Sequence, residues 1–219
     1  MKKLLLKTSF LALLAGSLAG TAQAALITNP GFETGDFTGW LYSHGPSVGV
    51  LSSYTATPTS SDGRTYTGPE GKFFAVVVGG GAADGYTSIA QQFDMNAGDV
   101  LKGYSAFDAR EPRGYADGAI ALIKVANAST LLYFKNVPVV GDTGSSPWES
   151  WSFVAPVAGT YCFGFAVGNA VDNDNRYNSV GLLDLEYISS PVPDAASSML
   201  LLGCAVSGLE GLRRRFKRA

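Results

Sequence analysis

Few residues in this chain have the types and spacing that catalysis needs. The chain contains one histidine, His44, which stands beside Gly45 and Pro46 in an expected loop. A single histidine cannot build a histidine-rich zinc site, and no spacing singles out a catalytic triad or a carboxylate pair. The sequence therefore predicts a protein that is not an enzyme, with paired carboxylates left open as an alternative.

Two further groups of residues could carry chemistry but are expected not to. Of the two cysteines, Cys204 lies in an apolar run near the C-terminus, so Cys162 has no disulfide partner in the middle of the chain. We expect Cys162 to pack as a small apolar residue rather than to act as a nucleophile, because no histidine lies near it in sequence. Residues 172–176 (DNDNR) lack the glycine and the glutamate of an EF-hand loop, which favours a polar hairpin turn over a calcium loop.

Aromatic side chains give the chain a means of binding carbohydrate. The apolar faces of sugars stack on exposed tryptophan and tyrosine rings, while asparagine, aspartate and arginine bind the hydroxyl groups. Trp148 and Trp151 fall on opposite faces of one expected strand, so at most one of them points outward. Core packing is the alternative for any single aromatic residue. The candidate ligand-binding residues are Trp148, Trp151, Tyr115 and Tyr177.

These residues must be positioned by β-strands, because no segment has a sustained helical period. In residues 161–167 (YCFGFAV) large and small side chains alternate, which predicts a strand with Tyr161, Phe163, Phe165 and Val167 facing the core. Residues 72–78 (KFFAVVV) form an unbroken apolar run that is typical of a central strand buried on both faces. Further strands are expected at 48–56, 87–93, 100–107, 118–125, 131–136, 148–154 and 180–188.

This pattern of strands predicts an all-β fold. Nine or ten strands without intervening helices must pair antiparallel, and two stacked sheets are the usual way to bury their apolar faces. We therefore expect an antiparallel β-sandwich in residues 25–190, with a jelly roll preferred over an immunoglobulin-like sandwich. The latter is disfavoured because no cysteine pair brackets a tryptophan.

The first 24 residues have the three parts of a secretory signal peptide. Three lysines are followed by an apolar run at 10–19 and by the small residues Ala22 and Ala24 of a cleavage site. We expect a signal helix that is cut by signal peptidase after Ala24, in preference to a buried N-terminal helix.

The last 29 residues, 191–219, have the features of a membrane stop. An apolar run at 199–209 precedes Arg213, Arg214 and Arg215. A helix over 198–212 would span about 22 Å, which is short of a hydrocarbon layer of roughly 30 Å, so local thinning or snorkelling arginines must help. The positive-inside rule places the arginines in the cytoplasm and the domain outside, at least while the helix is inserted.

The charge of the middle segment excludes one class of partner. Residues 25–194 hold 8 basic and 17 acidic residues, a net charge of −9, between two basic ends. Because contact with phosphates needs clustered lysine or arginine, we expect no nucleic-acid partner.

The C-terminal segment resembles a known sorting signal. Val192, Pro193 and Asp194, followed by small residues, the apolar run and the arginine cluster, resemble the PEP-CTERM sorting tail in its Val-Pro-Asp variant. This resemblance implies processing by a membrane-embedded exosortase near Pro193 and Asp194, and delivery to the cell surface or an exopolysaccharide matrix. Ala195 and Ala196 stand where the variant usually has serine and glycine, which leaves the cut site open. A plain membrane anchor is the alternative.

The start of the middle segment resembles a second family. Residues 29–40 (NPGFETGDFTGW) are similar to the opening of galactose-binding-like jelly rolls, which include carbohydrate-binding modules. This resemblance implies one structural calcium ion held by Glu33, by loop carbonyls and by Asp184 of the last strand. By alternation Asp184 and Glu186 share a face, so they meet Glu33 if the first and last strands are neighbours. A solvated carboxylate pair without an ion is the alternative.

Together these features predict an exported protein of the cell surface or extracellular matrix. Its expected role is structural or adhesive within the exopolysaccharide layer, without catalysis. A carbohydrate-binding module that recognises an extracellular polysaccharide is the alternative function, and a secreted glycan-active enzyme is a third and less favoured one.

Overall fold

The computed structural model of the protein describes residues 26–43, 48–56, 63–80, 85–169 and 177–188. His44, the 172–176 segment, the signal segment with Ala22 and Ala24, and the sorting segment with its expected membrane helix all lie outside these residues. Among the described residues, no helix has both the length and the apolar character that a membrane crossing requires.

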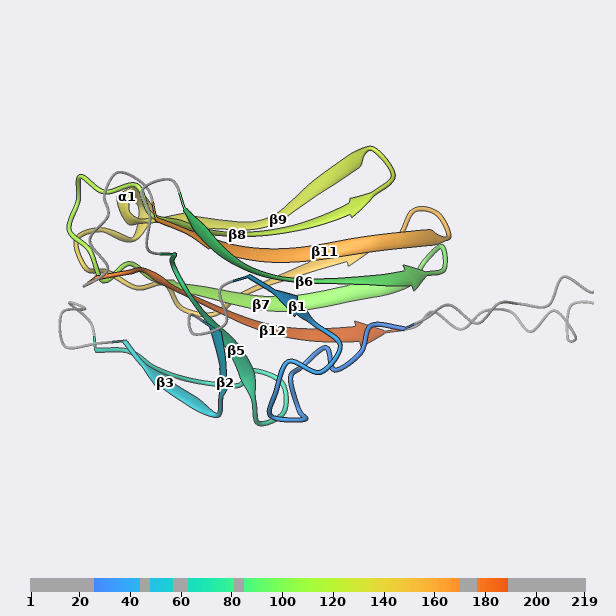
Figure 1. Cartoon of the computed structure of the whole chain (residues 1–219), viewed down its shortest axis with the longest axis horizontal. Coiled ribbons are helices and arrows are strands. Elements are labelled where there is room, and N and C mark those ends of the chain that lie inside the picture. Colours follow the sequence, from blue (N-terminus) through green and yellow to red (C-terminus); the bar gives the residue numbers. More distant parts are fainter. Residues whose placement is uncertain (1–25, 44–47, 57–62, 81–84, 170–176, 189–219) are drawn as a thin grey trace, which may run out of the picture.

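Two five-stranded antiparallel sheets form the two layers of the fold (Figure 1). Sheet A has the strand order β1-β6-β11-β8-β9. Its strands are Leu41–Tyr42 (β1), Tyr86–Met95 (β6), Gly159–Gly168 (β11), Gly118–Val125 (β8) and Ala128–Asn136 (β9). Sheet B has the order β10-β7-β12-β5-β2. Its strands are Glu149–Val154 (β10), Val100–Asp108 (β7), Val180–Ile188 (β12), Phe74–Val78 (β5) and Val48–Leu51 (β2).

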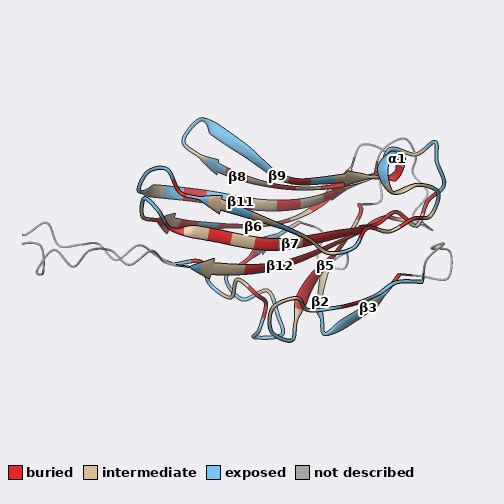
Figure 2. Cartoon of the chain, turned by 180° about the vertical axis from the view of Figure 1, so that it is seen from behind, coloured by how far each residue is buried: buried red, intermediate tan, exposed pale blue. Residues whose placement is uncertain are grey.

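The core lies between the two sheets and follows the alternation of the strands. Tyr161, Phe163, Phe165 and Val167 of β11 are fully buried, which confirms the prediction for this strand. Figure 2 shows the same alternation as bands of buried and more accessible residues along β7 and β11. The prediction for Cys162 is wrong, because its side chain is exposed on the outer face of sheet A. The strand alternation that buries its large neighbours turns the cysteine outward.

A two-stranded hairpin covers part of the outer face of sheet B. It consists of Ser53–Thr55 (β3) and Thr65–Thr67 (β4). Tyr66 of the hairpin, Phe74 and Val76 of β5 and Leu182 of β12 form a second apolar cluster beneath it. Ala75 and Val77 of β5 face the main core instead. This arrangement confirms that β5 is a central strand buried on both faces.

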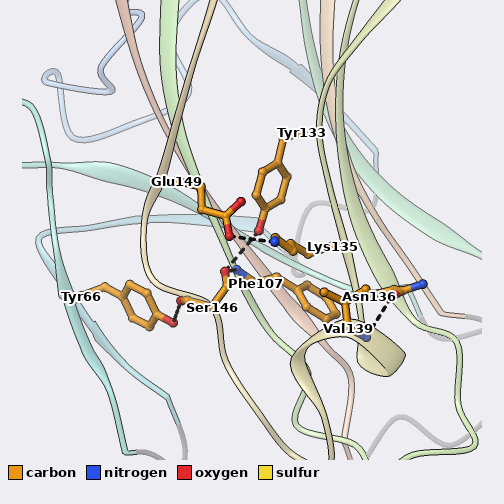
Figure 3. Close-up of polar contacts among 8 residues, drawn as sticks. All are labelled: Tyr66, Phe107, Tyr133, Lys135, Asn136, Val139, Ser146 and Glu149. Carbon is orange, nitrogen blue, oxygen red and sulfur yellow. Dashed lines mark hydrogen bonds and ion pairs between the residues drawn. The ribbon is translucent and has the colours of Figure 1, made fainter.

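A buried polar network connects the hairpin with both sheets around Ser146, as Figure 3 shows. Phe107 N of β7 donates to Ser146 Oγ at 3.0 Å, and the Tyr133 hydroxyl of β9 lies 3.3 Å from the same atom. The Tyr66 hydroxyl donates to the Ser146 carbonyl at 2.6 Å. Burial raises the pKa of Tyr133 above its ordinary value, so its hydroxyl stays protonated.

The two sheets are also joined at one edge. Lys135 of β9 forms an ion pair of 2.8 Å with Glu149 of β10 (Figure 3). The chain leaves β9 in a single helical turn, Val137–Val140 (α1), in which the Asn136 side chain accepts a hydrogen bond from Val139 N at 3.2 Å. Four residues are too few for a helical period to be recognised in the sequence.

The all-β antiparallel sandwich is confirmed, and its jelly-roll topology stays a prediction. Strands β8 and β12 have the predicted bounds, and the predicted 48–56 strand is divided into β2 and β3. The described residues form twelve strands: the nine expected ones, of which one is divided in two, and the two short strands β1 and β4, which the sequence pattern missed.

Candidate functional site: an acidic site and an aromatic groove

Glu33 lies in the opening loop, where backbone donors hold its carboxylate. Glu33 Oε1 accepts hydrogen bonds from Lys72 N and Phe73 N, both at 2.9 Å. These donors belong to a turn in which Gly71 has φ +70 and lies against the Glu33 carboxylate, so a larger residue there would displace it. These hydrogen bonds therefore hold the Glu33 side chain in one position although the residue is exposed.

Asp184 lies on β12 and is fully buried. It accepts hydrogen bonds from Glu70 N at 3.0 Å and from Leu185 N at 2.8 Å. A Cβ added at Gly31 of the opening loop would lie 3.4 Å from Asp184 Oδ1 and 3.7 Å from Glu33 Cγ. The opening loop therefore brings Glu33 close to Asp184 of the last strand, with Gly31 near both side chains.

Sequence reasoning missed a third carboxylate of this acidic site, Glu70. It accepts a hydrogen bond of 3.1 Å from the Tyr104 hydroxyl, and its charge acts on Asp184. Burial, supported by the negative charges of Glu33 and Glu70, raises the pKa of Asp184 to about 7. Glu186 instead forms an ion pair with Lys102 at 3.6 Å.

The acidic site has the donor type that calcium prefers, but part of its capacity is already used. Glu33 and Asp184 each accept hydrogen bonds from two backbone N–H groups. Among the residues that the structure describes, no group of three or more His, Cys, Asp or Glu side chains has the arrangement of a metal site. An ion held here would need carboxylate lone pairs beyond those hydrogen bonds, together with carbonyl or water ligands.

The two candidate tryptophans lie on opposite faces of sheet B, as predicted, and each is half-buried against an apolar cluster. The Trp148 ring lies edge-on to Tyr66 and Phe74 at 5.8 and 5.5 Å, and its indole N–H donates to the Thr67 carbonyl at 3.0 Å. Trp148 is thus covered by the β3–β4 hairpin.

Trp151 faces the main core. Its ring stacks on Phe163 at 5.7 Å and lies directly over Gly103, where a Cβ would collide with it. Its indole N–H donates to Ser105 Oγ at 3.0 Å. The other two candidates lie apart from the tryptophans. Tyr115 is half-buried in the loop before β8, and Tyr177 is exposed just before β12.

Two aromatic residues outside the predicted set stand on the outer face of sheet A. Tyr86 at the start of β6 is 61% exposed and Phe134 of β9 is 51% exposed. They flank a shallow depression of about 420 Å³, which we call the sheet A groove. Its lining residues are Tyr86, Ala116, Gly118, Ala119, Ile120, Phe134, Ala166 and Gly168.

Glycine and alanine residues, together with Ile120, form the floor of the sheet A groove on two adjacent strands. Gly168 and Ala166 of β11 are paired with Gly118 and Ile120 of β8. Tyr86 is the register partner of Gly168, and Phe134 is the register partner of Ile120. The two rings therefore stand on the strands that border this floor, at a separation of about three strand spacings of roughly 4.8 Å.

Comparison with known proteins identifies the C-terminal segment. Residues 191–216 match the VPDSG-CTERM motif, which confirms the sorting signal predicted from Val192, Pro193, Asp194 and the arginine cluster. The motif indicates that the chain is exported and sorted by an exosortase-type system. No curated protein matches the chain.

Several solved structures are similar to the sandwich at low sequence identity. TmCBM61 in complex with β-1,4-galactotriose is 16% identical, with 76% of this chain and 99% of that chain covered and a TM-score of 0.47. The K3 adhesin domain of Lys-gingipain from Porphyromonas gingivalis W83 is 15% identical, with coverage of 75% and 99% and a TM-score of 0.44. A family 16 carbohydrate-binding module is 16% identical, with coverage of 75% and 99% and a TM-score of 0.40.

Proposed function

We propose that this protein is an exported, non-catalytic component of the exopolysaccharide layer, in which it binds polysaccharide through the sheet A groove. The sorting motif supports its delivery to the cell surface or matrix. The observation that carries the binding function is the placement of Tyr86 and Phe134, two exposed rings on either side of an apolar floor of small residues. Exposed aromatic rings beside the sheet A groove can stack on the apolar faces of sugar units.

The charge of the domain favours neutral glycans as ligands. Residues 25–194 carry a net charge of −9, and no charged residue lines the sheet A groove. A polyanion such as polygalacturonate would be repelled by the domain as a whole, whereas a neutral chain meets no such barrier. Binding then depends on ring stacking and on exclusion of water from the floor.

The proposal can be tested by affinity electrophoresis of the full-length chain on neutral galactan, xylan, glucan and mannan, and on polygalacturonate. We expect retardation by at least one neutral polysaccharide and none by polygalacturonate. Tyr86→Ala and Phe134→Ala should each weaken the retardation about tenfold, which corresponds to about 1.4 kcal/mol of binding free energy. Leu131→Ala is the matched control, because Leu131 is an equally exposed apolar residue of β9 that does not line the groove.

Two results would count against this function. Unchanged retardation of the Tyr86→Ala and Phe134→Ala variants would exclude the groove as the binding surface. Release of shorter sugars from a polysaccharide that the chain binds would show turnover and would contradict the non-catalytic role.

We also propose that the acidic site holds a structural calcium ion, with Glu33 and Asp184 as ligands. The support is that Glu33 and Glu70 place negative charge near the buried carboxylate of Asp184, and a cation would offset this repulsion. The ion would stabilise the junction of the opening loop with β12. We expect the melting temperature of the chain to rise on addition of calcium and to fall in chelator, and Glu33→Gln to abolish this difference. An identical melting temperature in calcium and in chelator would contradict the proposed calcium site.

A further inference from the structure

The opening loop carries a line of aromatic rings from the core to the surface. Phe32 is fully buried and contacts the half-buried Phe37 edge-on, at 5.8 Å between ring centroids. Phe37 in turn contacts Tyr42 of β1 at 5.5 Å. Tyr42 is 51% exposed, so the line ends in an accessible ring that is supported from behind. Such a supported ring loses little conformational freedom when a ligand stacks on it.

A carboxylate is fixed beside this ring. Asp36 Oδ1 accepts hydrogen bonds from Thr34 Oγ1 at 2.6 Å and from Thr38 N at 2.9 Å. Its backbone carbonyl accepts a further bond from Asn29 Nδ2 at 2.9 Å. The bonds from Thr34 and Thr38 lower the pKa of Asp36, so the side chain stays ionised and able to accept hydrogen bonds.

The ring and the carboxylate border one depression of about 370 Å³, which we call the edge cleft. It is lined by Asp36, Phe37 and Thr38 of the opening loop, Tyr42 of β1, and Val48 and Val50 of β2. Strand β1 is an edge of sheet A and β2 is an edge of sheet B, so the cleft lies at the side of the sandwich. It shares no lining residue with the sheet A groove.

We propose that the edge cleft is a second glycan-binding site and that the protein therefore bridges two neutral polysaccharide chains. This inference rests on the proposed function, since it assigns a second site for the same class of ligand. The Tyr42 ring takes the apolar face of a sugar unit, and the Asp36 carboxylate accepts hydrogen bonds from its hydroxyl groups. With two sites on different faces, one protein molecule can cross-link two polysaccharide chains, and this role requires no catalysis.

The chemistry of the cleft selects a neutral sugar over other occupants. An anionic group would meet the Asp36 carboxylate within a domain of net charge −9. A cation would find a single carboxylate among the lining residues, which is too few for a calcium or magnesium site. A purely apolar partner would bury the ionised Asp36 carboxylate without a compensating cation or further hydrogen-bond donors, at a high desolvation cost.

The test is a calorimetric titration of the full-length chain with the soluble oligosaccharide of whichever neutral polysaccharide retards it. We expect two oligosaccharides per wild-type chain. Tyr42→Ala and Asp36→Asn should each reduce this number to one, by weakening the second site at least tenfold, whereas Tyr42→Phe should keep both sites. Leu41→Ala is the matched control, because Leu41 is the exposed neighbour of Tyr42 in β1 and does not line the cleft.

The outcomes separate the two sites. One oligosaccharide per wild-type chain, unaffected by Tyr42→Ala but lost in Tyr86→Ala, would overturn the edge cleft and leave the proposed function intact. Binding that is lost in Tyr42→Ala and unaffected in Tyr86→Ala would overturn the sheet A groove and keep the edge cleft as a single site, so bridging would also be excluded. As a readout of bridging, mixing the wild-type chain with the high-molecular-mass polysaccharide should raise its viscosity, and the Tyr42→Ala variant should not.

Discussion

At the scale of single residues, the buried carboxylate of Asp184 should make the stability of the chain depend on pH. Its folded-state pKa is raised to about 7, above the ordinary value of about 3.9, so the folded state binds the proton more tightly than the unfolded state. The stabilisation from the protonated form is complete below pH 4 and is lost as the pH rises towards 7. In chelator, Asp184→Asn should therefore gain stability relative to wild type between pH 5 and pH 8.

Thermal melts of the two proteins at both pH values check this expectation. A relative gain on the order of 1 kcal/mol would shift the melting temperature by about 2–4 °C for a domain of this size. Glu186→Gln is the control, since Glu186 is accessible on the same strand and should show no such trend. A constant difference between Asp184→Asn and wild type across the pH range would contradict the raised pKa.

Several residues show what the sequence could and could not predict. Alternation placed Phe163 and Phe165 in the core correctly, because the period of a strand is a local property. The exposure of Cys162, Tyr86 and Phe134 depends instead on whether another layer covers the outer face of sheet A, and no local pattern contains that information. Glu70 was missed for a similar reason, since it is 114 positions from Asp184 and reaches it only through the fold.

At the scale of the elements, the Ser146 network holds β7 and β9 in register with the segment that precedes β10. Ser146→Ala would leave the buried Phe107 N–H and the Tyr133 hydroxyl without this partner. We expect a loss of about 1–3 kcal/mol in the free energy of unfolding, measured by urea denaturation. Ser152→Ala on the exposed face of β10 should change it by less than about 0.5 kcal/mol. Equal effects of the two substitutions would show that the network adds nothing to stability.

The β3–β4 hairpin explains the position of Trp148. The sequence indicated that at most one of the two tryptophans points outward, and Trp148 does lie on the outer side of sheet B. It is nevertheless covered, because the hairpin adds a third layer over β5 and β12. The second strand of this hairpin, β4, was too short to stand out in the sequence, and β3 was predicted only as the end of a longer strand. The packing of Trp148 thus depends on a hairpin that the sequence pattern revealed only in part.

At the scale of the whole molecule, the signal-peptide pattern and the sorting motif each predict one change in covalent structure. The chain recovered from its own host should begin at Ala25 and should end near Pro193 and Asp194, or carry an added group there. Intact-mass measurement of the isolated protein reports both ends at once. Recovery of the complete 219-residue chain would contradict both processing steps.

The place of β12 in sheet B determines how the sandwich meets mechanical tension. This strand runs between β7 and β5, pairs with β7 along all nine of its residues and leads directly into the sorting segment. A force applied at the C-terminal end of β12 would therefore act along the axis of an interior strand. It would load the hydrogen bonds of β12 to its neighbouring strands together, in shear, instead of breaking them one after another. A matrix protein that is attached through this strand would resist mechanical unfolding when force is applied through a bound polysaccharide.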